Sequence, residues 1–365
     1  MRTKSDAPTF GIEEEFLLVD PQTGHPLPRN REVADAARAD GVELQLELTR
    51  CQVETTSSVL STSAEALDEI HGLRARVAAA ADRVGACLLA VGVPPTIPDE
   101  FPITDSPRYR RIGEQFGMIA HEQGVCGCHV HVQIPDRETT VQVSNHLRPW
   151  LPTLLATTAN SSIYRDADSG HASWRTVVWS RWPAAGPPPY FESAHHYDDL
   201  VARLNETGAI LDDGMVYWDV RASSKFPTIE VRVSDVAATA AETVTYATLV
   251  RALVMTAQAA LDRGEVAPRI EAEMLRAAQW KAAHDGLAGS GMDLLAGQAV
   301  PALDLQDRMV EWARPALEDL GEYTAVRAAL RHTAQAGNGA IRQRNALREG
   351  GIDGVLQELI AATRR

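Results

Sequence analysis

The stretch GIEEEF, residues 11–16, alternates between acidic and largely apolar positions. Successive side chains of a β-strand point to opposite faces. Glu13 and Glu15 therefore share one face, and Glu14 falls on the other face among apolar neighbours. We expect residues 9–20 to form a strand that buries its apolar face and ends at the turn-forming residues 21–24.

Residues 125–134 alternate in the same way around two histidines. His129 and His131 share one face, whereas Cys126 and Cys128 fall on the opposite, apolar face. A tetrahedral zinc site that used both kinds of ligand would need a β-bulge to bring them to one side. The spacing favours the two histidines as candidate metal ligands, with buried core histidines as the alternative.

Two more segments carry charged side chains on one strand face. Residues 227–235 place Glu230 and Arg232 together, and Glu54 lies late in residues 42–55, which we expect to form a second strand or a hairpin. Glu230 and Arg232 alone would most often form a cross-strand ion pair. Like charges repel unless a cation lies among them. The recurrence of Glu, His and Arg on one face of four strands therefore predicts a curved antiparallel sheet whose concave side binds divalent metal.

The kind of ligand indicates the metal. Carboxylate oxygens suit Mg²⁺ or Mn²⁺, and one imidazole among them is tolerated, especially by Mn²⁺. Magnesium commonly completes its shell with phosphate oxygens, which suggests a nucleotide. The chain has neither a G-x-x-x-x-G-K-[ST] nor a G-x-G-x-x-G motif. We therefore expect any ATP site to be held through metal ions and arginines.

The rest of the chain predicts an α+β protein. Thr62 and Glu65 form a capping box that opens a helix, residues 87–93 look like a short buried strand, and residues 215–222 alternate as a further strand. From residue 237 onward the pattern is helical, with breaks at 286–291 and 337–339. We expect one domain over residues 1–365, with its sheet mainly in 9–235 and a helical part in 237–365.

Residues 161–191 have no regular period and are interrupted by glycines and prolines. A long irregular segment in a compact protein is usually functional or disordered, and its tryptophans argue against disorder. Arg165, Arg175 and Arg181 lie in it, as a lid over an anionic substrate would require. The alternative is that these arginines are structural and stack on the tryptophans.

Bulk composition excludes several classes of partner. The 365 residues carry a formal charge of −14 without a Lys/Arg-rich run, so nucleic acid and anionic membrane surfaces are poor partners. The N-terminal residues lack the apolar core of a signal peptide, and the most apolar region, 77–93, is broken by Asp82 and Arg83. We expect a cytoplasmic protein without a disulfide framework.

Several motifs in a fixed order resemble one known family: GIEEEF (11–16), CGCHVHV (126–132), LRPWLPTLLATTANSS (147–162), WSRWPAAGPP (179–188), TGAILDDGMVYWDVR (207–221) and PTIEVRVSD (227–235). They resemble the carboxylate–amine ligases of the glutamate–cysteine ligase type two, or YbdK-like, family. The resemblance implies a glutamine-synthetase-like fold, in which a curved antiparallel sheet forms a funnel and helices pack outside it.

The resemblance also implies a reaction. ATP would phosphorylate the carboxylate of an amino acid or another small acid, glutamate-like by expectation, and an amine would attack the acyl phosphate to form an amide. The implied metal ligands are Glu13, Glu15, Glu54, His131 and Glu230. Arg232 and Glu54 would be catalytic, and Arg232 would neutralise the transferring phosphoryl group.

Substrate binding would fall to a further set of side chains. These are His129, Asn160 and Arg221, together with the three arginines of residues 161–191. The amine, the general base and the presence of a homo-oligomer are left open by the sequence.

Three other readings remain open at this stage. His129, His131 and a glutamate could form a zinc-dependent hydrolase that needs no ATP. A non-catalytic relative could merely bind a nucleotide or an amino acid. More remotely, a phosphagen-kinase-type reaction would phosphorylate a guanidino nitrogen directly. The excess of glutamate over histidine counts against zinc, and the intact charged set counts against a non-catalytic role.

Overall fold

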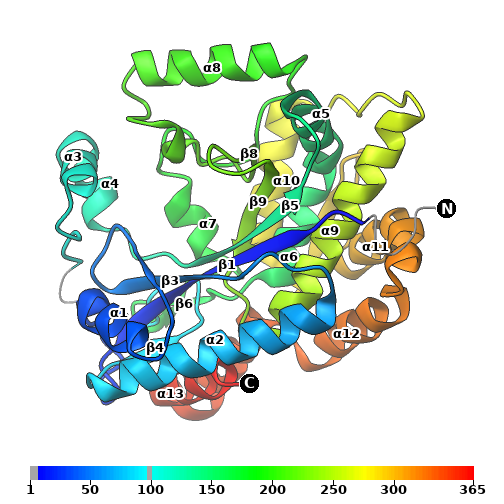
Figure 1. Cartoon of the computed structure of the whole chain (residues 1–365). Helices are drawn as coiled ribbons and strands as arrows, with labels where there is room; N and C mark the ends of the chain where they lie inside the picture. Colours follow the sequence, from blue (N-terminus) through cyan, green and yellow to red (C-terminus); the bar gives the residue numbers. More distant parts are fainter. Residues whose placement is uncertain (1–6, 97–100) are drawn as a thin grey trace.

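The computed structural model describes residues 7–96 and 101–365 (Figure 1). Its centre is a seven-stranded sheet in the order β2-β3-β1-β5-β9-β8, with β4 also paired to β1, and every pairing is antiparallel. The strands are β1 (Phe10–Val19), β2 (Gln45–Leu46), β3 (Gln52–Thr56), β4 (Cys87–Leu89), β5 (Gly127–Gln133), β8 (Val220–Ala222) and β9 (Thr228–Asp235).

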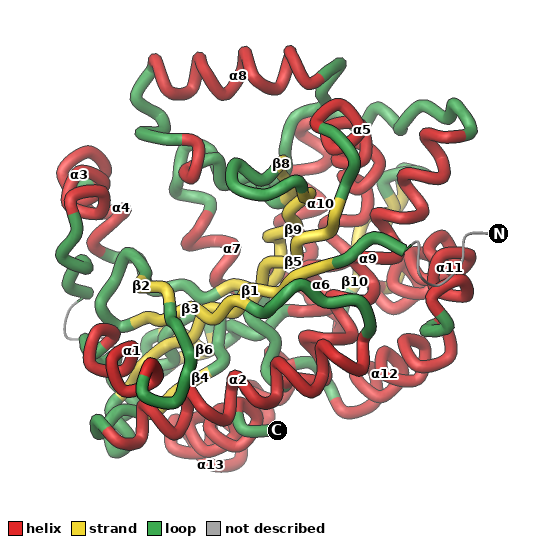
Figure 2. The backbone as a smooth tube through the Cα atoms, in the orientation of Figure 1, coloured by secondary structure: helices red, strands yellow, loops and turns green. Residues whose placement is uncertain are grey.

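Helices and loops lie around this sheet, as Figure 2 shows. The α-helices are α1 (Asn30–Arg38), α2 (Ser63–Arg83), α3 (Pro107–Phe116), α4 (Met118–His121), α5 (Arg137–Leu147), α6 (Leu151–Thr158), α7 (Trp174–Trp179), α8 (Ala194–Glu206), α9 (Ala240–Asp262), α10 (Ala272–Asp285), α11 (Ala302–Leu320), α12 (Tyr323–Ala336) and α13 (Gly339–Thr363). Short 3₁₀ turns are η2 (Arg148–Trp150), η3 (Asp213–Met215) and η4 (Gly286–Ala288).

The two faces of the sheet differ as the alternation predicts. Ile12, Phe16 and Val130 are fully buried in the main core, where α2, α6 and α9 pack on the strands. In Figure 1, α2 and α13 lie on one side of β1, and α3, α4, α7 and α8 stand around the other side. Of this second group, α3 and α7 supply side chains beside the charged strand face, among them Tyr109 and Trp179.

Several local predictions are confirmed. The strand over 9–20 is β1, residues 42–55 form the β2–β3 hairpin, and Thr62 caps α2 in a capping box with Glu65. The predicted strand over 215–222 is shorter, because η3 and an extended segment precede β8 at Val220.

Two regions differ from the sequence-based expectation. Residues 290–301, expected to be helical beyond the break at 286–291, form instead the hairpin β10 (Ser290–Asp293) and β11 (Gln298–Pro301). Asp293 accepts hydrogen bonds from the backbone of Leu295 and Ala296, and Gly297 supplies the positive φ of the turn. Residues 161–191, expected to be irregular, contain β6 (Ile163–Tyr164), β7 (Ala167–Asp168) and α7.

Helix α9 is the one helix among the described residues that is long and apolar enough to cross a membrane. It is mostly buried, and it packs against α2, α5 and α11. Its apolar character is therefore that of a core helix.

Glu14 shows how the buried face tolerates an acid. Its carboxylate accepts hydrogen bonds from Arg74 of α2 at 2.6 and 3.0 Å, and from the hydroxyl of Thr243 at 2.6 Å. Arg74 also donates to the carbonyl oxygens of Ala237 and Ala238 before α9. This ion pair, which is only 0–2% exposed, ties β1, α2 and α9 together.

We expect Arg74→Met to lower the free energy of unfolding by about 3–5 kcal/mol, because Glu14 would be left buried and unpaired. Denaturant unfolding measures the loss, and the double variant with Glu14→Gln should regain most of it. The matched change Arg38→Met, in an exposed pair with Asp35, should leave the free energy of unfolding nearly unchanged. Equal losses in Arg74→Met and Arg38→Met would contradict the buried pairing.

Candidate active site

The charged face of the sheet lines a cavity of about 480 Å³. Its volume is within the range of small-molecule sites. Strands β1, β3, β5 and β9 form its floor, and side chains of α3, residues 179–182 and residues 212–226 form its walls. The cavity therefore lies where several separate segments converge on one sheet.

Strand register brings the predicted ligands together. Glu15 faces Glu54 across β1 and β3, and Glu13 faces His129 across β1 and β5. His131 in turn faces Glu230 across β5 and β9. The antiparallel pairing thus converts the period-two pattern of separate segments into one contiguous polar surface.

Ligand atoms from this surface form three compact groups. In each group the nitrogen or oxygen atoms lie within 4.8 Å of one another. The groups are Glu13, Glu54 and His129; Glu13, His131 and Glu230; and Glu15, Glu47 and Glu54. We call the second the histidine group and the third the acidic group.

These groups fit the oxygen-rich chemistry of Mg²⁺ or Mn²⁺. The buried Nε2 atom of His129 has no hydrogen-bond partner among the described residues, and His131 Nε2 lies 3.5 Å from Glu13 Oε1 within the histidine group. Cys126 and Cys128 are in none of the three groups and lie buried in the core, where Gln52 donates to the Cys126 sulfur. In the described part of the chain, cysteine and histidine do not combine at this site.

Burial and mutual repulsion control the protonation of the acidic group. Burial raises the pKa of Glu54 well above its ordinary value of 4.5, and the charges of Glu47, Glu13 and Glu15 raise it further. Burial also raises the pKa values of Glu15 and Glu47. The carboxylates cannot all ionise at low cost without a cation among them.

Glu13 and His129 behave in the opposite way. Although burial opposes it, hydrogen bonds from His129 and His131 hold the pKa of Glu13 below its usual range. Burial and the nearby Arg232 charge lower the pKa of His129, which is therefore neutral at pH 7. A neutral imidazole is the form that binds metal.

Arg232, on β9, lines the same cavity as the carboxylates. Its Nη1 atom hydrogen-bonds to Glu230 and lies 3.3 Å from His129 Nδ1. Arg221, on β8, pairs with the other Glu230 oxygen at 2.8 Å. Although burial opposes it, these two guanidinium groups hold the pKa of Glu230 well below its usual range.

The arginines of residues 161–191 do not converge on the cavity. Arg165 lies in the β6–β7 turn with φ of 50°, over the ring of Tyr164, and Arg181 forms a part-exposed ion pair with Glu122. Arg175 is buried beside the first residue of β5, where its Nη2 atom would lie 2.4 Å from a Cβ added to Gly127, and it does not line the large cavity. The lid of arginines expected from the sequence is therefore not the arrangement in the structure.

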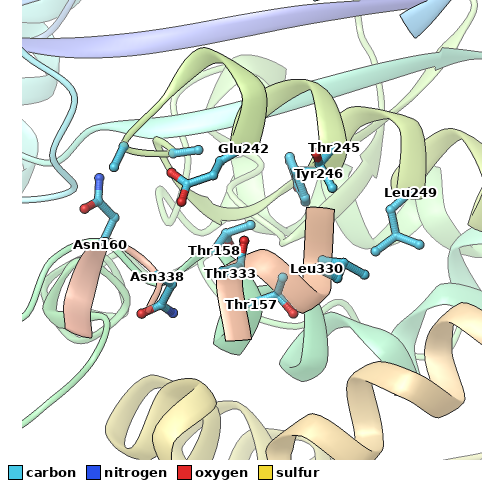
Figure 3. Close-up of a pocket in the computed structure, with 13 residues that line it drawn as sticks. Thr157, Thr158, Asn160, Glu242, Thr245, Tyr246, Leu249, Leu330, Thr333 and Asn338 are labelled. Carbon is cyan, nitrogen blue, oxygen red and sulfur yellow. The ribbon is translucent and has the colours of Figure 1, made fainter. Parts of the chain in front are cut away.

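Asn160 borders a different and much smaller pocket, shown in Figure 3. Its side chain donates to the carbonyl oxygens of Ala90 and Val236 and accepts from Gln343 at 2.8 Å. The pocket of about 30 Å³ has room for about two water molecules. Asn160 thus joins segments of the fold and lies outside the large cavity.

Several residues of the cavity were missed from the sequence. Glu47 belongs to the acidic group, and strict alternation over residues 44–48 (LQLEL) is the signal that could have found it. The walls include the Arg108–Asp212 ion pair at 2.8 Å, and Trp179 packed against Tyr217 at 4.6 Å. These wall residues have no period in the sequence.

Comparisons with known proteins give one consistent match. The model of glutamate–cysteine ligase family 2 matches residues 9–362. A relative from Mycolicibacterium smegmatis, which carries the provisional name glutamate–cysteine ligase 2-3, is 58% identical over 361 residues. That alignment covers 98% of this chain and 99% of the relative.

Solved structures agree on the fold. The glutamate–cysteine ligase of Francisella tularensis in complex with AMP has a TM-score of 0.69 at 13% identity, with 98% of this chain and 88% of that chain covered. The ligase PafA in complex with the ubiquitin-like protein Pup has a TM-score of 0.61 at 14% identity, with 100% and 74% covered. At these identities the likeness concerns the fold alone.

We expect Glu54→Gln to stabilise the metal-free protein by about 1–2 kcal/mol at pH 8, a rise in Tm of about 2–4 °C. The raised pKa of Glu54 gives the sign. Below the ordinary carboxyl pKa the residue is protonated in both folded and unfolded chains, and the cost of ionising it in the fold grows as pH rises. The gain should therefore be larger at pH 8 than at pH 5.

Thermal unfolding in a chelating buffer at both pH values measures this difference. Glu43→Gln, at an exposed carboxylate, serves as the control and should change little at either pH. A loss of stability in Glu54→Gln at pH 8 would mean that repulsion in the acidic group has been misjudged.

Proposed function

The chain belongs to glutamate–cysteine ligase family 2, and we propose that it uses ATP to join a glutamate-like acid to an amine through an acyl phosphate. The family assignment makes it an ATP-dependent carboxylate–amine ligase. The proposal adds the donor acid, the divalent metal and the roles of individual residues. A cytoplasmic location, where ATP is supplied, agrees with this use of the nucleotide.

One observation supports these roles most strongly. Carboxylates of Glu13, Glu15, Glu54 and Glu230 line one cavity together with the guanidinium of Arg232. Phosphoryl transfer needs little covalent chemistry from a protein, since its rate depends on positioning and on stabilisation of charge. A polar face with metal ligands beside a fixed arginine meets both requirements.

We assign metal binding to the three groups, with Glu13, Glu15, Glu47, Glu54, His129, His131 and Glu230 as ligands. Bound Mg²⁺ or Mn²⁺ would supply positive charge to the phosphate oxygens of ATP. Glu54 belongs to two of the groups, so its loss would disturb both.

The proposed reaction has two steps. A carboxylate oxygen of the acid attacks the γ-phosphorus of ATP, the bond to the β-phosphate oxygen breaks, and ADP leaves. The amine nitrogen then attacks the carbonyl carbon, phosphate leaves, and the amine loses a proton to a base. Arg232, held between Glu230 and His129, is placed to offset charge on the transferring group.

The cavity walls would select the acid and the amine. The rings of Trp179, Trp182 and Tyr217 form a packed apolar wall, and Arg108 with Asp212 adds a charged pair near the opening. The names of the relatives suggest glutamate and cysteine as substrates. We propose an amino-acid donor of this kind and leave the amine to experiment.

The zinc hydrolase has less support. Each of the three groups contains more glutamate than histidine, and the nearby cysteines belong to the core. A non-catalytic relative would have no need for this set of buried charges beside Arg232.

We expect hydroxamate and ADP to form when the protein is incubated with Mg·ATP, hydroxylamine and a panel of acids that begins with glutamate. Hydroxylamine intercepts an acyl phosphate, so the natural amine need not be known. The acid that gives hydroxamate identifies the donor. Absence of ADP with every acid, together with absence of ATP binding, would reject the ligase in favour of zinc-dependent hydrolysis.

We expect Arg232→Ala to lower the rate of ADP formation by roughly 10³-fold or more, because an arginine at a transferring phosphoryl group contributes about 10³–10⁵. Glu15→Gln should also remove most turnover, and both variants should remain folded by circular dichroism. Arg137→Ala, at a part-exposed pair with Asp198 outside the cavity, is the control. Turnover near wild type in Arg232→Ala would disprove its assigned role.

A further inference from the structure

We propose that Arg221 keeps the histidine group closed to free divalent cations, so that this group accepts a cation only together with the phosphates of a nucleotide. The inference rests on the proposed function, since it concerns how the site assembles around ATP. It makes Arg221 a positioning residue that acts through Glu230, in place of the substrate-binding role expected from the sequence.

Both oxygens of Glu230 are occupied by guanidinium groups. Arg221 Nε lies 2.8 Å from Oε2 and Arg221 Nη2 lies 3.2 Å from Oε1, which is the bidentate geometry of a strong pair. Arg232 Nη1 hydrogen-bonds to the same Oε1 atom. Glu230 is only 2% exposed, so water does not screen these contacts. A cation that enters alone must displace a guanidinium group to reach this carboxylate.

Arg221 is also fixed from behind. Its Nη1 atom donates to the carbonyl oxygens of Gly214 at 3.0 Å and Val216 at 2.6 Å, in the loop that forms part of the cavity wall. Arg221 and Glu230 are direct cross-strand partners in β8 and β9. The backbone therefore holds the guanidinium against Glu230 without help from a ligand.

Because of these two arginines, the histidine group and the acidic group differ in how far their negative charge is balanced by guanidinium groups. In the histidine group, the carboxylates of Glu13 and Glu230 are matched by the two guanidinium groups of Arg221 and Arg232. In the acidic group, none of the three carboxylates forms an ion pair with a lysine or arginine in residues 7–96 and 101–365. Free Mg²⁺ or Mn²⁺ is thus attracted to the acidic group first.

A nucleotide changes this balance, because its phosphates are strong acceptors for arginine and also ligands for Mg²⁺. When phosphate oxygens accept from Arg221 and Arg232, the Glu230 oxygens become free to bind a cation. Filling of the histidine group is then conditional on ATP.

The test counts Mn²⁺ ions bound per chain by equilibrium dialysis of the metal-free full-length protein. We expect one more Mn²⁺ per chain in the presence of a non-hydrolysable ATP analogue than in its absence. Arg221→Met should bind that additional Mn²⁺ without the nucleotide, because Glu230 loses its bidentate partner. A residue with only a structural role would not increase the number of bound ions.

Arg342→Met is the matched control. Arg342 also forms a bidentate pair, with Glu242 at 2.8 and 3.0 Å, and also donates to a carbonyl oxygen, that of Gly337. Its partner Glu242 lines the small pocket of Figure 3 and not the large cavity. The Mn²⁺ count of Arg342→Met should therefore match that of wild type. This control separates loss of a buried ion pair in general from release of Glu230.

Equal Mn²⁺ counts with and without the analogue in wild type would overturn the inference, as would an unchanged count in folded Arg221→Met. If Arg221→Met does not fold, Arg221→Gln takes its place in the same count, because an amide cannot form the bidentate ion pair with Glu230. The hydroxamate assay tests the ligase separately. An additional Mn²⁺ in nucleotide-free Arg221→Met, without acid-dependent ADP release in wild type, would reject the ligase and retain this inference.

Discussion

Repulsion among buried carboxylates is the constraint on which the arrangement of this molecule depends. Glu13, Glu15, Glu47 and Glu54 lie in one cavity, and burial together with their mutual charge raises the pKa of Glu54. Such a cluster opposes folding unless apolar burial elsewhere exceeds its cost. The opposite face of the same strands supplies that burial, with Ile12, Phe16 and Val130 fully enclosed by helices. One sheet thus carries the destabilising and the stabilising surface back to back.

The acidic side chains of the central strands fall into two classes, those with an ion-pair partner and those without one. Glu14, on the core face, has a permanent partner in Arg74 and additional hydrogen bonds, so its charge is satisfied within the fold. Among residues 7–96 and 101–365, Glu15 and Glu54 on the cavity face form no ion pair with a lysine or arginine, and Arg175, beside Gly127, acts on Glu15 only through its charge. A permanent pair suits a structural role, and an unsatisfied carboxylate suits a ligand that binds and leaves.

The sequence predicted the sheet and its polar floor because both depend on alternation, which is local. The alternation of side chains along each strand placed Glu13, Glu15, His131 and Glu230 on polar strand faces. Antiparallel pairing of the strands then made them neighbours. The walls depend on contacts between distant segments, such as Arg108 with Asp212, and no local rule predicts these. Arg175 shows the same limit, since its place beside Gly127 follows from the path of residues 161–191 and not from its own neighbours in sequence.

Because the floor and the walls of the cavity are built from different elements, substrate preference and metal binding can change separately. The floor is fixed by strand register, since a shift of one residue would turn every ligand away from the cavity. The walls come from α3 and from residues 179–182 and 212–226, whose packed rings and surface ion pair do not take part in the register. Wall side chains can therefore be exchanged without moving the ligands below them. Arg221 is the exception, because it joins the 214–216 loop directly to Glu230 and so links the wall to the floor.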